Sequence, residues 1–174
     1  MKRCFLILLA GIIACSFALQ AQPPSANPVS TEAKAAYTQI KNNLLKMADK
    51  MTEENYAFKP TPEMRDFGAT IAHIADSQMR TCSTVNGEAK QLGAASKKTK
   101  ADLVSALQAS FVECDKAFDA LTDATAMQMI TAGRSQRSKL GVLVGNTTHD
   151  NEEYGYLAVY LRLKGVVPPS SEPR

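Results

Sequence analysis

The sequence predicts an all-α fold of the four-helix-bundle type, spanning residues 30–165. Three observations predict this fold. Four long segments place apolar residues three or four positions apart, polar or proline-containing connections separate them, and no segment has the pattern of a strand ladder. The span is that of one ordinary domain with a single hydrophobic core, and amphipathic helices of this length bury their apolar faces by packing side by side.

The first predicted helix spans residues 31–51. Its apolar residues share one stripe: Ala36, Ile40, Leu44, Met47 and Met51. Ser30 or Thr31 is expected to cap its N-terminus. The loop that follows carries Tyr56 and Phe58. We expect these aromatic side chains to fold back onto the end of the bundle, because a purely connecting loop has no need of them.

The second predicted helix spans residues 67–85 and the third spans residues 100–121. Gly87 ends the second helix, as glycine commonly does just beyond a C-terminus. Thr99 followed by Asp102 resembles a capping box at the start of the third. The core-facing residues are Phe67, Ile71, Ile74, Gln78, Cys82 and Val85 in the second helix, and Leu103, Leu107, Phe111, Cys114 and Phe118 in the third.

The remaining segments complete the bundle. A short helical turn is expected at residues 124–130 and a loop at residues 131–138. The last helix is predicted at residues 139–164, ending before Gly165. Residues 166–174 are expected to form an extended tail.

Residues 1–21 have the order of a secretory signal peptide. Lys2 and Arg3 give a positive start, an apolar run follows as far as Leu19, and small residues lead to predicted cleavage after Ala21. The run is too short for a comfortable transmembrane helix. We therefore expect an exported protein, periplasmic or extracellular, with no stable membrane span after processing.

Two other interpretations of this segment stay open. Cys15 follows residues that loosely resemble a lipobox, which would give a lipid-anchored protein on the outer surface, and an uncleaved anchor is the other alternative. All three interpretations place the domain outside the cytoplasm. Residues 22–29, which contain three prolines, are expected to form an extended linker.

The charge balance argues against nucleic acid as a partner. Removing Lys2 and Arg3 from the 20 basic residues leaves 18 against 17 acidic ones, a net charge of +1. A protein that neutralises many phosphates needs a far larger basic excess or a basic stripe.

Cysteine usage points to one disulfide. Cys4 and Cys15 lie in the signal segment, so the mature chain keeps Cys82 and Cys114. Two cysteines on neighbouring helices in an oxidising compartment favour a bridge. Two separate buried thiols are the alternative, which the sequence leaves open.

His149 and Glu153 are the strongest pair of candidate site residues. They lie four positions apart on the last predicted helix, so their side chains project from one face. That face lies beside the apolar stripe and not on the polar side of the helix. Metal coordination is one reason for a histidine and a glutamate to flank a core. A structural His–Glu hydrogen bond is the other, and the spacing leaves both open.

His73 is a weaker candidate on spacing alone. On a helical wheel it points nearly opposite to the apolar stripe of the second helix, together with Ala69, Asp76 and Arg80. The wheel therefore predicts a solvated histidine. His73 becomes a ligand only if this face of the helix looks onto the cavity at the end of the bundle.

Two motifs resemble those of the DinB-like superfamily, over most of residues 31–164. The motif residues are Phe58-Lys59-Pro60, Pro62, Arg65, Phe67-Gly68 and His73-Ile74-Ala75-Asp76, and then His149-Asp150-Asn151-Glu152-Glu153-Tyr154-Gly155. The middle helix matches only in character. The resemblance implies a four-helix bundle. In many members it also implies a divalent metal held by three histidines, one from the second helix and two, four apart, from the last.

Carried over by this resemblance, the ligand positions are His73, His149 and Glu153, so a glutamate stands where the third histidine is usual. Two histidines and a carboxylate can bind zinc, nickel or iron(II) and leave positions open for water or substrate. Such a metal would act as a Lewis acid or activate water. Candidates for supporting or proton-transfer roles are Asp76, Asp150, Tyr156 and Tyr160; surface charge or core packing is the alternative for each.

The leading expectation is an exported DinB-like protein that binds a divalent metal. A metal-dependent activity, as a hydrolase or a transferase, is compatible with this expectation, and the sequence does not assign one. The rival is a non-catalytic exported binding or structural module with a decayed metal site, which the change at Glu153 and the orientation of His73 favour. A thiol-dependent transferase rests on the resemblance alone. Expected partners are a small molecule of unknown identity and no nucleic acid; a homodimer stays open.

Overall fold

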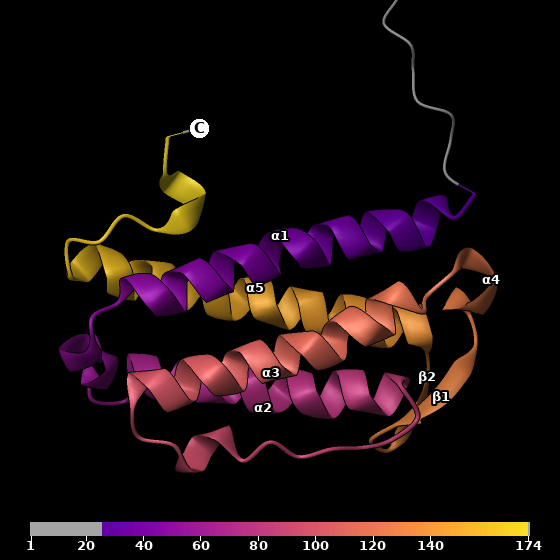
Figure 1. Cartoon of the computed structure of the whole chain (residues 1–174), viewed down its shortest axis with the longest axis horizontal. Helices are drawn as coiled ribbons and strands as arrows, with labels where there is room; N and C mark the ends of the chain where they lie inside the picture. The colour runs from indigo at the N-terminus through magenta and orange to yellow at the C-terminus, as the bar shows by residue number, and fades with distance from the viewer. Residues whose placement is uncertain (1–25, 174) are drawn as a thin grey trace, which may run out of the picture.

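The computed structural model describes residues 26–173. Within them, four long helices form an elongated bundle, which confirms the predicted all-α fold class (Figure 1). These helices are α1 (Pro28–Lys50), α2 (Phe67–Val85), α3 (Lys100–Asp119) and α5 (Lys139–Leu163). The shorter elements are η1 (Glu53–Ala57), η2 (Ala94–Ser96), α4 (Asp123–Ala126), β1 (Met129–Ala132), β2 (Ser135–Ser138) and η3 (Pro169–Ser171). The predicted signal peptide, residues 1–21, lies outside the described residues, as do residues 22–25 of the predicted linker.

The helices pack as two pairs that also contact each other. Helix α1 packs against α5, α2 packs most extensively against α3, and α2 also contacts α5. The largest fully buried side chains of the core include Tyr37, Leu44, Phe67, Phe111, Phe118 and Tyr160. A disulfide joins Cys82 of α2 to Cys114 of α3, as predicted. This bond links the two helices covalently.

Side-chain caps explain where three of the helices begin. The Asp66 side chain accepts a hydrogen bond from Ala69 N at the start of α2, and Thr99 and Ser138 cap α3 and α5 in the same way. Helix α1 differs, because it begins at Pro28, inside the predicted linker. Its first turn is capped from a distance by the carboxylate of Asp123, which accepts hydrogen bonds from two of its backbone N–H groups.

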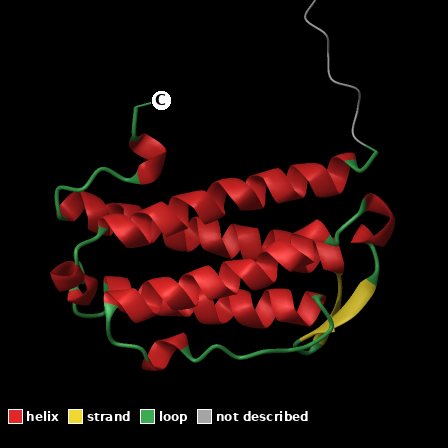
Figure 2. Cartoon of the chain, viewed as in Figure 1, coloured by secondary structure: helices red, strands yellow, loops and turns green. Residues whose placement is uncertain are grey.

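The loop predicted at residues 131–138 is wrong, because this segment belongs to a β-hairpin (Figure 2). Strands β1 and β2 pair antiparallel, with Met129 opposite Ser138. A two-residue turn joins them, and Gly133 adopts a φ of 64° there, a conformation that favours glycine. The hairpin also shortens the helical turn predicted at residues 124–130, which ends at Ala126.

The aromatic residues of the first loop pack onto the bundle, as predicted. Tyr56 is buried, and its hydroxyl donates a hydrogen bond to the carbonyl of Ala48 at 2.6 Å. Phe58 packs edge-on against Tyr160 of α5, with ring centroids 6.0 Å apart. The loop is therefore part of the wall around that end of α5.

An extended tail is predicted at residues 166–174, but its described part, residues 166–173, folds back onto the bundle. It contains the turn η3, and Pro169 is buried. The Ser170 backbone N–H donates to the Tyr154 hydroxyl at 2.9 Å, and Glu172 forms an ion pair with α1. These contacts hold the C-terminal segment against α1 and α5.

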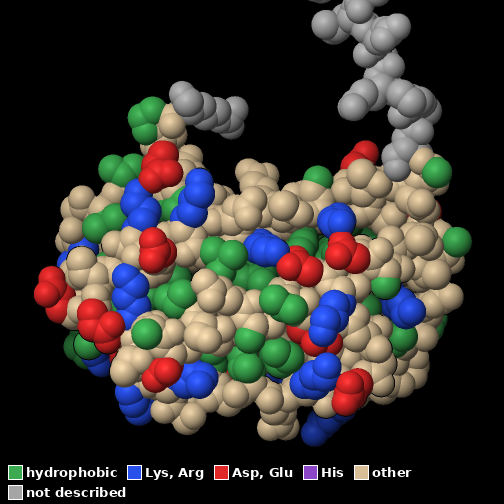
Figure 3. All heavy atoms as spheres, viewed as in Figure 1, with side chains coloured by type: hydrophobic (Ala, Val, Ile, Leu, Met, Phe, Trp, Pro, Cys, Tyr) green, Lys and Arg blue, Asp and Glu red, His purple; other side chains and the backbone are tan. Residues whose placement is uncertain are grey.

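The surface carries mixed charge. Figure 3 shows basic and acidic side chains interspersed with hydrophobic ones over the visible face, in keeping with the small net charge. Among residues 26–173, no helix combines the length and the apolar character that crossing a membrane requires.

Candidate metal centre

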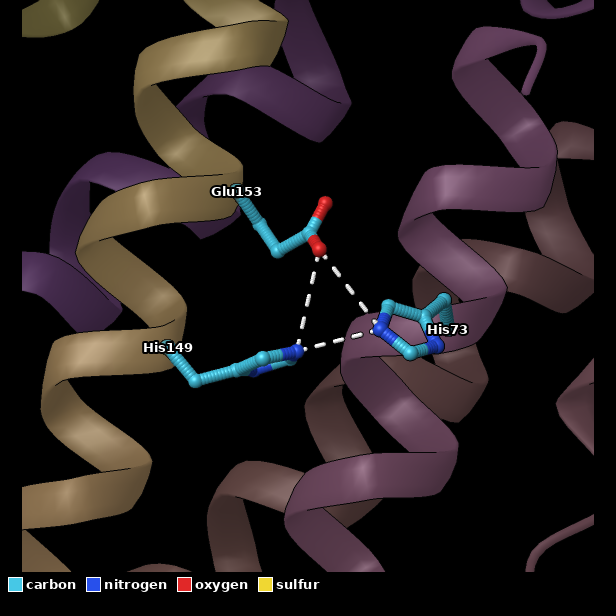
Figure 4. A group of neighbouring side chains, drawn as sticks. All are labelled: His73, His149 and Glu153. Carbon is cyan, nitrogen blue, oxygen red and sulfur yellow. Dashed lines mark hydrogen bonds and ion pairs between the residues drawn. The ribbon is translucent and has the colours of Figure 1, made fainter. Parts of the chain in front are cut away.

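Three polar side chains from two helices converge beside the core (Figure 4). His73 comes from α2, and His149 and Glu153 come from α5. The Nε2 atoms of the two histidines lie 3.0 Å apart. Glu153 Oε1 lies 3.5 Å from His73 Nε2 and 3.7 Å from His149 Nε2. The structure thus brings together the three residues singled out as candidate ligands.

The triangle formed by these three atoms has the size that a tetrahedral metal needs. Ligand atoms about 2.0–2.1 Å from zinc, at tetrahedral angles, lie roughly 3.3–3.4 Å from one another. The measured separations of 3.0, 3.5 and 3.7 Å lie on both sides of that value. The two separations to Glu153 are also too long for strong hydrogen bonds. Two imidazole nitrogens and one carboxylate oxygen therefore fit zinc, nickel or iron(II).

The solvated orientation that the helical wheel predicts for His73 is wrong. Its side chain is only 35% exposed and faces α5. A wheel with a single apolar stripe assumes one packing partner, whereas α2 packs against both α3 and α5. The face opposite the main stripe is therefore a second interface, and His73 lies in it.

Asp150 lies on the other side of the His149 ring. It is fully buried, and its Oδ1 lies 3.6 Å from Nδ1 of His149, while its Oδ2 accepts a hydrogen bond from Asn146 Nδ2 at 3.0 Å. A carboxylate beside Nδ1 favours the tautomer that carries the proton there. That tautomer leaves the lone pair on Nε2, the atom that faces His73 and Glu153.

The electrostatic environment acts differently on the two histidines. Burial, reinforced by the positive charge of Arg65, lowers the pKa of His73. The Asp150 carboxylate raises the pKa of His149, against the opposite effect of burial. Burial also raises the pKa of Asp150 itself, to about 6. At neutral pH, His73 is therefore uncharged and can offer a lone pair to a cation.

The other three supporting candidates lie in different places. Asp76 is not part of the cluster, because its carboxylate accepts hydrogen bonds from the backbone of Ala94 and Ala95 and so holds η2. Tyr160 is buried, and its hydroxyl donates to the backbone carbonyl of Arg65. Tyr156 is half-exposed, and its hydroxyl donates to Glu152. Only the two tyrosines lie near Glu153.

A pocket of about 340 Å³ adjoins the cluster. Glu153, Tyr156 and Tyr160 line one side of it, and Met64 and Arg65 line the other. Arg65 has no predicted role beyond its place in a motif, because a position in a loop does not predict its neighbours in space. Its position directly before the α2 cap, Asp66, was the one available signal.

A helical bundle that holds two histidines and a carboxylate between two of its helices defines a class: small bundle proteins with a candidate metal centre at a helix–helix interface. The family model of the DinB superfamily matches residues 36–157, and the chain belongs to that superfamily. The resemblance of the two sequence motifs is thereby confirmed.

Solved structures support the same fold. A DinB-like protein from Bacillus cereus superposes with a TM-score of 0.70 at 15% identity, covering 80% of this chain and 95% of the other. A DinB-like protein from Bacillus subtilis gives a TM-score of 0.64 at 16% identity, covering 82% and 99%. At this level of identity the likeness shows the fold alone. No curated protein matches the chain.

Proposed function

We propose that this chain is an exported DinB-superfamily protein that binds one divalent metal through His73, His149 and Glu153. The observation that carries the proposal is the convergence of two Nε2 atoms and one carboxylate oxygen, from two helices, with separations that suit a common ligand sphere. Zinc, nickel and iron(II) are the candidate metals.

Export is supported by two features. Residues 1–21 have the composition of a signal peptide, and the Cys82–Cys114 disulfide suits an oxidising compartment.

Three protein ligands would leave coordination positions free, and a bound metal would supply Lewis acidity or an activated water there. The chain's own residues set up that chemistry. Asp150 orients the imidazole of His149, and the Tyr160 hydroxyl holds the loop that carries Arg65. The adjoining pocket gives a small molecule access to Glu153. This arrangement supports a metal-dependent hydrolase or transferase.

A second function, a non-catalytic module with a decayed metal site, is favoured by one observation. The two histidine Nε2 atoms are 3.0 Å apart, so a direct hydrogen bond can satisfy both without a metal. The two proposals differ in whether the protein holds a cation at all.

Metal content separates them. The protein is purified without chelators, offered zinc, nickel or iron(II), and its bound metal is measured by elemental analysis. We expect close to one metal per chain in the wild type, and its loss in His149→Ala and Glu153→Gln. Glu152→Gln is the matched control, because Glu152 is the exposed neighbour of Glu153, carries the same charge and is not one of the three converging residues. Absence of metal after reloading favours the non-catalytic module.

A further inference from the structure

The pocket beside the candidate metal centre is lined by both charged and apolar side chains. Its volume is about 340 Å³, which suits a small molecule. Met64, Tyr156 and Tyr160 supply flat or flexible apolar surface. Glu153 is both a candidate metal ligand and a lining residue of the pocket. A molecule in the pocket therefore lies next to the position that a metal would occupy.

Arg65 is the cationic group of this pocket. Within residues 26–173, its guanidinium has no hydrogen bond or ion pair to a side chain or backbone group. The neighbouring acids Glu63 and Glu153 line the same pocket, and neither pairs with it. An arginine beside two carboxylates that it does not engage is available for an outside anion.

The backbone that carries Arg65 is held in place from both sides. The carbonyl of Arg65 accepts a hydrogen bond from the Tyr160 hydroxyl at 2.8 Å, and the next residue, Asp66, caps α2. Its charge also reaches the cluster, because it contributes to the lowered pKa of His73. The backbone at Arg65 is thus held in place, and the guanidinium lines the pocket and is close enough to the cluster to act on His73.

We propose that this pocket binds a small organic carboxylate, whose charged end lies between the Arg65 guanidinium and the open side of the metal. A guanidinium presents two parallel donors that match a carboxylate, and a metal with three protein ligands accepts one more oxygen. The organic body packs against Tyr156, Tyr160 and Met64. This inference rests on the proposed metal-binding function.

A singly charged carboxylate suits the pocket better than a phosphate. One arginine stands against two acidic side chains, Glu63 and Glu153, so the lining has no excess positive charge to offer a dianion. The two tyrosines give an aromatic or apolar body its contact surface. Phosphate sites usually gather several donors or a helix N-terminus.

Binding of benzoate to the zinc-loaded protein, measured by titration calorimetry, tests the proposal. Benzamide is the neutral counterpart of the same shape. We expect benzoate to bind at least about tenfold more tightly than benzamide, and Arg65→Gln to reduce benzoate affinity by about tenfold or more. Arg80→Gln is the matched control. Arg80 also acts on His73 through its charge but lines other pockets, so benzoate affinity should stay within about twofold.

Metal content is measured on each sample first, so that the two proposals fail separately. If no zinc is bound, the proposed function fails. If zinc is bound but benzoate binds no better than benzamide, or Arg65→Gln leaves its affinity unchanged, the carboxylate site is wrong and the metal centre stands. Equal benzoate affinity with and without zinc, or tighter binding of inorganic phosphate, likewise overturns it. With cobalt(II) in place of zinc, a change in the visible spectrum on adding benzoate supports direct coordination.

Discussion

Helix α2 makes two contacts of opposite character. Against α3 it is mostly apolar and is crossed by the Cys82–Cys114 disulfide, and both cysteines are fully buried. Against α5 it is polar and reaches solvent, with the side chains of His73 and His149 being 35% and 26% exposed. In the second contact, His149 Nδ1 and Asp150 Oδ1 lie 3.6 Å apart, too far for a strong hydrogen bond, and neither atom has another hydrogen-bond partner among the described residues.

The two contacts together show how a small bundle accommodates an unfavourable polar cluster. Buried polar atoms without hydrogen-bond partners lower the free energy of unfolding. A fold tolerates them only where other contacts stabilise it by a larger amount. Here the α2–α3 contact, which is mostly apolar and carries the disulfide, holds α2 in position. The α2–α5 contact can then keep ligand-like groups facing one another. If the two contacts are independent, a change in the α2–α3 contact should alter stability and leave zinc affinity unchanged. A change in the α2–α5 contact should chiefly alter zinc affinity.

Removing the disulfide should have the largest effect on stability. The bridge closes a loop of 32 residues, and the chain-entropy relation gives about 3 to 4 kcal/mol for that length. We expect the Cys82→Ala/Cys114→Ala variant to lose this amount, measured by urea unfolding at constant slope. Reduced wild type is the control and should behave like the variant. Zinc affinity should change less than about threefold; a larger loss would show that the two contacts are not independent.

Zinc should stabilise the protein by a somewhat smaller amount, through the other contact. At a free concentration about 100 times the Kd, a ligand that binds only the folded state adds about 2.7 kcal/mol to the free energy of unfolding. Thermal unfolding with zinc, and then with excess chelator, measures the gain and its reversal. His149→Ala should gain nothing. Equal stabilisation of wild type and variant would place the metal elsewhere.

Sequence patterns predicted most of the bundle because its helices are long. Helix α2 was predicted at residues 67–85 and is found there, since Asp66 caps one end and the apolar stripe runs to Val85. The hairpin was missed for the opposite reason. Its strands have four residues each, are exposed or half-buried, and show too little alternation to predict a strand.

The candidate site was only partly predictable. His149 and Glu153 share one helix, so their spacing alone places them together. Predicting the position of His73 requires knowing that α2 packs against two helices. A single helical wheel does not contain that information. Arg65 was given no binding role, because its place depends on Tyr160, which is 95 positions away in the sequence. Local periodicity carries information on faces of helices, whereas contacts between distant elements come from the assembled fold.

Asp150→Asn should weaken zinc binding by about tenfold, the scale seen for residues that orient a metal ligand. An asparagine amide can donate to Nδ1 of His149, which would move the ring proton to Nε2 and block coordination there. Competition with a chromophoric chelator measures the affinity. Asp76→Asn is the matched control, because Asp76 holds η2 away from the cluster and should leave zinc affinity within about twofold.

The same variant should change how the stability of the metal-free protein depends on pH. Burial raises the pKa of Asp150 from 3.8 to about 6, so the folded state binds an extra proton between these values. The stability that Asp150 contributes is therefore complete below pH 3.8 and is lost as pH rises through 6. Relative to Asp150→Asn, the wild type should become steadily less stable over this range. Urea unfolding of both proteins at pH 4, 5, 6 and 7 checks the direction; parallel curves would contradict it.

The smallest predicted effect concerns a polar link inside the mostly apolar α2–α3 contact. Gln78 of α2 and Ser110 of α3 are both fully buried. Gln78 Nε2 donates to Ser110 Oγ at 3.3 Å. Ser110→Ala leaves that amide group without this partner, which should cost about 1 kcal/mol of unfolding free energy. Zinc affinity should not change, because the link lies on the α3 side of α2. Ser110→Ala and Asp150→Asn thus form a pair, since one should alter stability alone and the other chiefly metal binding. Loss of zinc affinity in Ser110→Ala would mean that α2 transmits changes from one of its contacts to the other.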